Sequence, residues 1–309
     1  MQQTAKKAKV EDADDGLVWR ASFHQTNGLK TLIDVVCNIL TRINLSISYD
    51  ADKGESHLCI DSIDPQQVCM IKARLQCENT KGIEKKTEFC IESSVLNLFL
   101  KSLPAHYSVN LEQREGSSDL RVFAYETLNA NHTTELLMPT FMDDGETMQL
   151  FDMKYDYTLE MDLTTLRQHV KMSQALNAKH LTFKVYEPPD EDTDDKTRKS
   201  LLTIESRDGD SRYKQSFHSA TIREENQDTC TIRAALDSTD PDKSHASWKL
   251  KFDEDFSTQY MNHFLKSMDR QVITMKLTKD RPFIMNYQLS ADGCYVCFVL
   301  APKTRDDDE

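Results

Sequence analysis

The most constraining feature of this sequence is that its two halves repeat one order of helical and extended segments. Four segments space their apolar residues as helices do: 28–44, 93–103, the run after Asp162, and the run after the acidic residues 253–255. Between them apolar and polar residues alternate, which predicts short strands. Because four helices are too few to cross between all these strands, the pattern favours antiparallel sheets in an α+β fold.

The helical stripes define the expected buried faces. The first runs from Leu29 to Ile43, the second includes Val95 and Phe99, and the fourth repeats aromatic residues from Phe256. Asp162 is expected to cap the third helix. The strands are predicted at about 17–23, 45–49, 57–61, 67–75, 87–91, 107–112, 119–125, 133–138, 155–161, 180–186, 200–206, 212–218, 228–234, 247–252, 271–278, 282–289 and 295–301.

The repeat divides the chain into two similar domains and three further segments. Residues 138–154 are rich in turn formers and methionine, which is typical of a connector, and both ends of the chain read as polar tails. The predicted organisation is a disordered tail (1–16), domain 1 (17–137), the connector (138–154), domain 2 (155–303) and an acidic tail (304–309).

Composition excludes several functional classes. The 309 residues include only 8 glycines, all at least twelve positions apart, so glycine-rich nucleotide loops and the GxSxG elbow are absent. The net charge of −13 argues against a chain covered with basic residues for nucleic-acid binding, although it does not exclude a local basic surface. We expect no cofactor and no enzymatic activity.

The compartment is predicted to be intracellular, because neither a signal peptide nor a membrane-spanning run is evident. The eight cysteines are therefore expected to be thiols. Cys294 and Cys297 form a CxxC inside a predicted strand, where they serve packing better than metal binding. The aspartates at 190, 192 and 194 do not complete a calcium loop. Lys6, Lys7 and Lys9 have the spacing of a nuclear import signal, with a solubilising tail as the alternative.

Three motifs near the C-terminus resemble the sliding clamp family, proliferating cell nuclear antigen. They are YMNHFLK at 260–266, DRPFIMNYQL at 280–289, and FVLAPK at 298–303 before an acidic tail. IDSIDPQQVCMIKARL at 60–75 is similar to a strand-turn-strand of the same family. The resemblance implies a nuclear homotrimeric ring that encircles duplex DNA during replication and repair. Its partners would be a DNA polymerase, a clamp loader and proteins that carry aromatic-ended peptides, with no membrane involved.

The resemblance also implies two sites. The four helices would line a DNA channel, where six cations and Asp34 give a net charge of +5; the cations are Lys30, Arg42, Lys101, Arg167, Lys171 and Lys266. Contacts there would be made to phosphates, independently of sequence. A hydrophobic pocket would receive partner peptides through Ile63, Val68, Met70, Met148, Leu150, Pro282, Val299, Leu300, Ala301 and Pro302.

Departures from the family pattern affect specificity and regulation. Val299 replaces a usual aromatic residue and Gln67 a usual histidine, so the family's preferred peptide motif is not carried over to this chain. Tyr186 occupies the position at which the family carries a modified lysine, so the resemblance does not imply that regulation for this chain. Edge strands near 133–138 and 212–218 would pair between subunits.

Three alternative functions remain open at this point. The chain is compatible with one subunit of a heterotrimeric checkpoint clamp of the same fold. A monomeric or dimeric processivity factor that grips DNA without encircling it is the second alternative. The third is a metal-dependent nuclease that uses the acidic clusters.

Overall fold

The computed structural model describes residues 16–50, 52–83, 86–127, 132–141, 154–187, 197–223, 230–234, 248–266, 272–289 and 294–303. The chain forms two compact units. Unit 1 comprises Met1–Ser62, Lys72–Thr147 and Gln288–Val296, and unit 2 comprises Ile63–Ile71, Met148–Tyr287 and Cys297–Glu309. The predicted connector falls almost entirely outside the described residues, as do the two tails.

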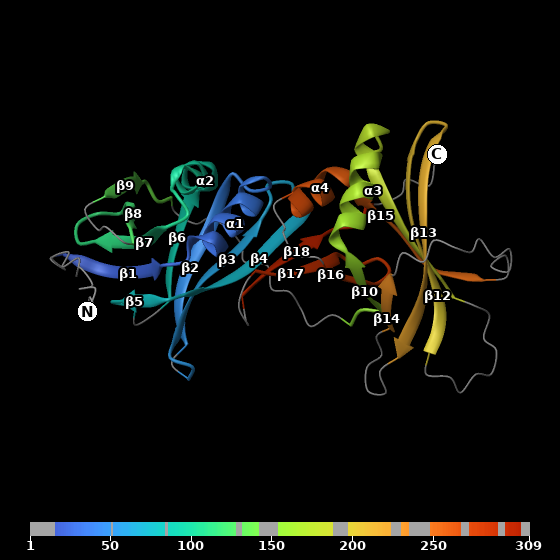
Figure 1. The fold of residues 1–309 in the computed structure, drawn as a ribbon, viewed down its shortest axis with the longest axis horizontal. Coiled ribbons are helices and arrows are strands. Elements are labelled where there is room, and N and C mark those ends of the chain that lie inside the picture. The colour runs from blue at the N-terminus through green and yellow to red at the C-terminus, as the bar shows by residue number, and fades with distance from the viewer. Residues whose placement is uncertain are drawn as a thin grey trace, which may run out of the picture. The chain divides into compact units, whose positions relative to one another are not determined.

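Unit 1 combines two helices with antiparallel strands (Figure 1). One sheet has the order β5-β1-β7-β8-β9, and four further strands follow the order β4-β3-β2-β6. The helices α1 and α2 pack against each other. The elements are β1 (Leu17–Phe23), α1 (Thr26–Cys37), β2 (Arg42–Asp50), β3 (Glu55–Ile63), β4 (Cys69–Cys77), β5 (Asn79–Lys81), β6 (Thr87–Glu92), α2 (Ser93–Ser102), β7 (Tyr107–Arg114), β8 (Leu120–Glu126) and β9 (Thr133–Met138).

Unit 2 also combines two helices with strands, which here follow one continuous order (Figure 1). Its strand order is β15-β11-β12-β13-β14-β10-β16-β17-β18, and α3 packs against α4. The elements are β10 (Tyr157–Asp162), α3 (Leu163–Ala175), β11 (His180–Glu187), β12 (Thr197–Asp208), β13 (Ser211–Arg223), β14 (Cys230–Ala234), β15 (Lys249–Ser257), α4 (Thr258–Lys266), β16 (Val272–Leu277), β17 (Phe283–Gln288) and β18 (Tyr295–Leu300).

The predicted α+β class with antiparallel sheets is confirmed, with one exception in strand direction. β10 pairs with β14 in parallel, from Tyr157 opposite Cys230 to Met161 opposite Ala234. The prediction of antiparallel sheets did not include this one parallel pair. Local alternation does not carry strand direction, because parallel and antiparallel strands both place successive side chains on opposite faces.

The first helix is shorter than predicted. α1 ends at Cys37, where the amides of Ile39 and Leu40 bond to the carbonyl of Val36, and β2 begins at Arg42. The prediction of a helix to residue 44 counted Ile43 as part of the helical stripe. Ile43 instead begins the alternation of buried residues along β2, which continues through residues 45 and 47. The two periods overlap at this residue, and the pairing of β2 with β6 favours the strand.

The buried face of α2 also differs from the prediction. Val95 is 37% exposed and the neighbouring Leu98 is 70% exposed, while the polar residues Ser93 and Asn97 are buried. The Ser93 hydroxyl donates to backbone carbonyls of residues 40 and 41, and the Asn97 amide donates to Cys37 Sγ at 2.8 Å. These bonds offset part of the cost of burying the two polar side chains, because buried polar groups need partners.

The predicted start is correct for α3 and wrong for α4. Asp162 Oδ1 accepts a hydrogen bond from the Thr165 amide at 3.1 Å, so the predicted N-cap of α3 is confirmed. The fourth helix was predicted to begin after the acidic residues 253–255. These residues and Phe256 lie in β15 and pair with β11, so α4 begins only at Thr258.

Candidate functional site

The basic residues on the helices of unit 1 form a hydrogen bond or an ion pair with other groups of the protein. The Lys30 amino group on α1 donates to the Leu103 carbonyl at 2.7 Å, and burial lowers its pKa. Lys101 on α2 forms an ion pair with Asp34 on α1, and the hydrogen bond to Asp34 raises the pKa of Lys101. These two cations and one anion give the helices of unit 1 a net charge of +1.

Arg42 does not lie on a helix, which corrects its expected position. It is an exposed residue at the start of β2, and its guanidinium carbon lies 4.3 Å from the centre of the Phe141 ring. A cation at this distance from a ring is attracted to the aromatic face. Arg42 therefore contacts Phe141 and is not one of the cations on the helices.

The helices of unit 2 carry more positive charge than those of unit 1. Arg167 on α3 donates through Nε at 2.9 Å and Nη2 at 2.6 Å to the Leu265 carbonyl near the C-terminus of α4. A cation satisfies an otherwise orphaned carbonyl at a helix end, so Arg167 joins the two helices. Lys171 on α3 and Lys266 on α4 are exposed, and the helices of this unit have a net charge of +3.

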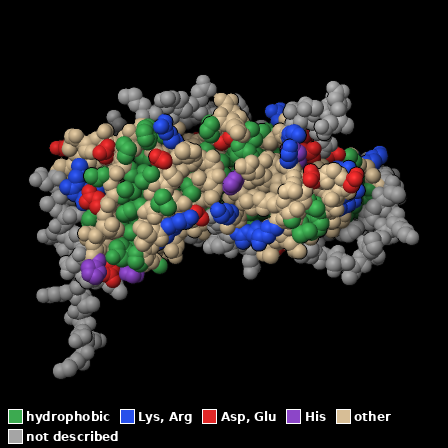
Figure 2. Space-filling view, turned by 90° about the horizontal axis from the view of Figure 1, so that it is seen from above, with side chains coloured by type: hydrophobic (Ala, Val, Ile, Leu, Met, Phe, Trp, Pro, Cys, Tyr) green, Lys and Arg blue, Asp and Glu red, His purple; other side chains and the backbone are tan. Residues whose placement is uncertain are grey.

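Exposed apolar side chains accompany these cations. On α2 they are Val95 and Leu98, and on α3 Met172 is 41% exposed. In Figure 2, hydrophobic side chains gather over unit 1, while lysine and arginine side chains stand as separate groups. The helix surface of unit 1 is therefore less basic than the sequence predicted, because Arg42 is absent from it and Lys30 is half-buried.

Part of the predicted peptide pocket comes together within unit 2. Met70 and Val299 form a small buried cluster with Cys297, against which Ile63 and Ile284 pack. Four more of its predicted residues are described: Val68, Pro282, Ala301 and Pro302 are all half-buried. The Val68 carbonyl accepts a hydrogen bond from the Ala301 amide at 2.9 Å.

The remaining three of the predicted pocket residues are not placed in this cluster. Leu300 is fully buried and is therefore a core residue, a role that strand alternation also favours. Met148 and Leu150 lie outside the described residues. The prediction from sequence did not include Ile284 and Cys297, although both lie on predicted strands next to motif residues. The alternation of apolar residues does not distinguish a core position from a pocket position.

Two sheet edges carry charge. On β9, Glu135 is exposed, Leu137 is 59% exposed, and a hydrogen bond from Arg121 lowers the pKa of Glu135. Among the described residues, β14 pairs with β13 only from Thr221 to Arg223, which leaves the earlier part of that edge accessible.

A buried carboxylate on β12 forms ion pairs with several cations beside the edge of β13. Glu205 on β12 lies within 4.0 Å of four cations, namely Lys184, Arg207, Arg212 and Lys214. Burial alone would raise the pKa of Glu205, but the hydrogen bond from Arg212 and the neighbouring cations hold it below the ordinary value. The carboxylate therefore stays ionised and offsets part of the positive charge of these four side chains.

Two solved structures have this arrangement of elements over nearly the whole chain. The proliferating cell nuclear antigen (PCNA) of Entamoeba histolytica has a TM-score of 0.67 at 13% identity, covering 93% of this chain and 100% of that chain. PCNA of Thermococcus kodakaraensis has a TM-score of 0.67 at 14% identity, covering 92% of this chain and 100% of that chain. This chain has the PCNA fold.

The relationship is visible in structure and not in overall sequence. No protein-family model matches the chain, and the search of curated proteins finds no match. The resemblance of the C-terminal motifs to the clamp family is nevertheless confirmed at the level of the fold. The PCNA fold thus persists at an identity where few individual positions are shared, as expected when pattern and volume specify a core.

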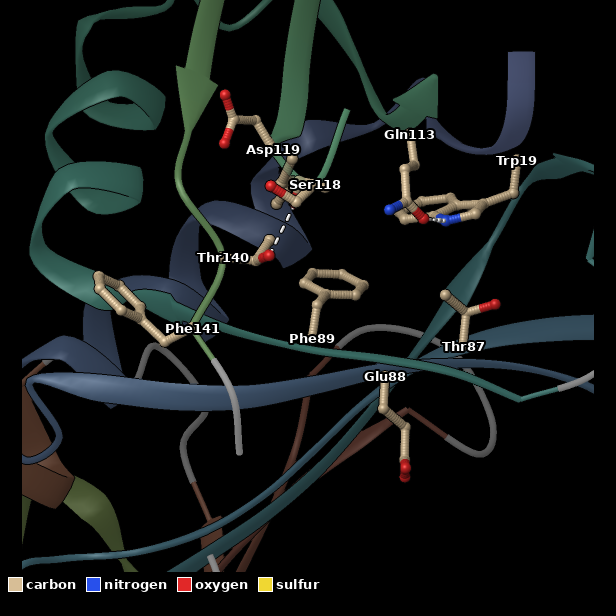
Figure 3. A pocket seen from close by; sticks show the side chains of 10 residues that line it. Trp19, Thr87, Glu88, Phe89, Gln113, Ser118, Asp119, Thr140 and Phe141 are labelled. Atoms are coloured by element: carbon tan, nitrogen blue, oxygen red, sulfur yellow. Dashed lines mark hydrogen bonds between the residues drawn. The ribbon is translucent and has the colours of Figure 1, made fainter. Parts of the chain in front are cut away.

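A small pocket in unit 1 lies apart from the predicted residues. It has a volume of about 90 Å³ and is lined by side chains that include Trp19, Phe89 and Phe141. Figure 3 shows Trp19 next to Gln113 and Phe89 below them, while Glu88 points away from the rings. Trp19 donates to Gln113 at 2.8 Å and stacks on Phe89 with ring centres 5.5 Å apart. These contacts explain the aromatic lining as packing inside the PCNA fold.

Neither metal chemistry nor a membrane anchor appears in the described part of the chain. No group of three or more potential metal ligands comes together there. Cys294 and Cys297 are both buried. No helix in the same residues has both the length and the apolar character needed to span a bilayer.

Proposed function

We propose that this chain is a DNA sliding clamp, a processivity factor for DNA polymerase that has no catalytic activity of its own. The observation that carries the proposal is the match to two PCNA structures along their full length and over 92–93% of this chain. A match of this extent includes both units, which favours a two-domain clamp protomer over a single clamp-like domain attached to a different fold. The expected site of action is the nucleus, during replication and repair.

Duplex DNA is the proposed ligand of the helix surface. Lys171 and Lys266 are exposed on α3 and α4, where their ammonium groups can reach phosphates. Lys101 is also exposed, although Asp34 neutralises part of its charge. The helices of unit 2 would therefore contribute more to DNA binding than those of unit 1. Such contacts are independent of base sequence and weaken with salt, which suits a protein that slides.

Three copies are proposed to close into a ring through their sheet edges. The candidate surfaces are the free edge of β9, which presents Glu135 and Leu137, and the accessible part of β13, which presents Arg212 and Lys214. Opposite charges on the two edges favour head-to-tail pairing of different surfaces, and such pairing generates rings when the rotation closes. Pairing would also protect both edges from aggregation.

Partner proteins are proposed to dock through aromatic-ended peptides on the surface around Ile63, Met70 and Val299. Clamp loader and polymerase are the expected carriers of such peptides. Met70 and Val299 are buried, so the half-buried Ile63, Val68 and Ala301 beside them would make the peptide contacts.

The mass of the particle in solution tests ring closure against the alternatives. A homotrimer of the 35.6-kDa chain has a mass of about 107 kDa. A stable monomer at micromolar concentration would contradict the homotrimer. A monomer that forms a trimer only with two different chains would instead identify a subunit of a heterotrimeric clamp.

A further inference from the structure

One buried carboxylate organises the loop between β3 and β4. Asp64 is 2% exposed, and its Oδ1 accepts hydrogen bonds from the amides of Val68 at 2.7 Å and Cys69 at 2.5 Å. Its Oδ2 accepts from the Gln66 amide at 3.2 Å. Gln67 has a φ of +57°, a left-handed conformation that is uncommon for a residue other than glycine. The loop keeps this conformation because the Asp64 carboxylate binds the backbone on both sides of it.

The fourth hydrogen bond to this carboxylate comes from outside the loop. The hydroxyl of Tyr260 on α4 donates to Asp64 Oδ2 at 2.6 Å, and its distance to Gln66 Oε1 is 3.4 Å. Burial, the hydrogen bond and the negative charge of Asp64 all raise the pKa of Tyr260, so the hydroxyl remains a donor at neutral pH. α4 and this loop belong to the same unit.

The ends of the anchored loop belong to the proposed peptide surface. Ile63 precedes Asp64, and Met70 follows Cys69 within the cluster that contains Val299. Val68 is also bound to the C-terminal segment through its carbonyl and the Ala301 amide. A shift of Asp64 would therefore move the chain on both sides of the loop, together with the side chains that line this surface.

We propose that Tyr260 is a positioning residue for the peptide surface, acting through Asp64. The inference rests on the proposed peptide-binding function and adds to it a residue that contacts no peptide. Without the hydroxyl, Asp64 retains its backbone donors but loses its only described anchor to α4, and a buried acceptor site is left unsatisfied. The loop then samples other conformations, and peptide affinity falls in proportion to the competent fraction.

The test compares Tyr260→Phe with a matched variant, Tyr157→Phe. The Tyr157 hydroxyl also donates to a carboxylate, Glu187 Oε1 at 3.1 Å, in the same unit but outside the loop. Calorimetry with a synthetic peptide ending in paired aromatic residues should give a dissociation constant about fivefold higher for Tyr260→Phe. Hydrogen exchange of the Val68 and Cys69 amides in the peptide-free protein should become faster by a larger factor, because exchange follows the open population whereas affinity follows the closed fraction. Tyr157→Phe should change neither quantity.

The two readouts separate failure of this inference from failure of the proposed function. Unchanged affinity and unchanged exchange in Tyr260→Phe overturn the positioning role, even if its melting temperature falls, because the effect is then only on stability. If the unsubstituted protein does not bind the peptide, the proposed function of this surface is refuted, and exchange alone decides whether Tyr260 holds the loop. Asp64→Asn should accelerate exchange more than Tyr260→Phe, since it also weakens the backbone bonds.

Discussion

Charge reversal at Lys171 is the perturbation that most clearly separates phosphate binding from folding. Lys171 is exposed on α3, so Lys171→Glu leaves the buried face of the helix intact. If Lys171 and Lys266 each contact one phosphate in three copies, the ring makes about six contacts. A fourfold rise in salt then lowers the affinity for duplex DNA about 2,000-fold. The variant retains about three contacts, for which the same rise lowers affinity only about 40-fold.

The assay is fluorescence anisotropy of a labelled duplex between about 50 and 200 mM salt. Lys279→Glu is the control, because Lys279 is exposed in the turn between β16 and β17 and makes the same change of charge away from the helices. We expect Lys171→Glu to bind more weakly at low salt and to have a shallower salt dependence than the control. Equal slopes in the two variants would refute the assignment of Lys171 to the DNA surface.

Three further substitutions test the local energetics of unit 2. Asp162→Ala removes the cap bond to Thr165 and should lower the free energy of unfolding by about 1 kcal/mol in urea denaturation. Arg167→Ala removes the link to the Leu265 carbonyl and should cost about 1–3 kcal/mol, with a smaller effect on the salt slope of DNA binding than Lys171→Glu has. His169→Gln should flatten the dependence of stability on pH between 6.5 and 4, measured by urea denaturation across that range.

The pH prediction depends on the buried environment of His169. Burial lowers its pKa from 6.5 to about 4, and its ring lies near Ser206 and Gln215. Because the folded state disfavours the protonated ring, stability is fully present above pH 6.5 and falls as the pH decreases toward 4. The loss should reach about 2 kcal/mol at pH 5. An equally steep pH dependence in His169→Gln would assign the effect to other groups.

The sequence predicted best those features that depend on residues close together in the chain. Period-two alternation located β1 and β9 with the bounds that the structure has, and Asp162 marked the start of α3 because a cap bond spans only three residues. The end of α1 was missed because Ile43 fits both the helical and the extended period. Pairing with β6, distant in sequence, decides in favour of the strand.

The candidate sites required information that local patterns do not carry. Lys30 and Lys101 read as solvated cations, and only the fold brings them to the Leu103 carbonyl and to Asp34. The bond between Tyr260 and Asp64 joins residues 196 positions apart. Motif resemblance named Ile63, Met70 and Val299, which the structure brings into one cluster, and their role in peptide binding stays a prediction. It could not identify the anchor that holds the loop.

Retention on DNA whose ends are blocked tests the central claim, encirclement, most directly. The protein is mixed with a linear duplex, both ends are then capped with a bulky protein, and the complex is washed at about 0.5 M salt, which disrupts phosphate contacts. A ring should stay on the capped duplex and leave when an internal restriction cut opens it. Loss in the wash from capped and uncapped duplexes alike would contradict encirclement and indicate a protein that only grips DNA.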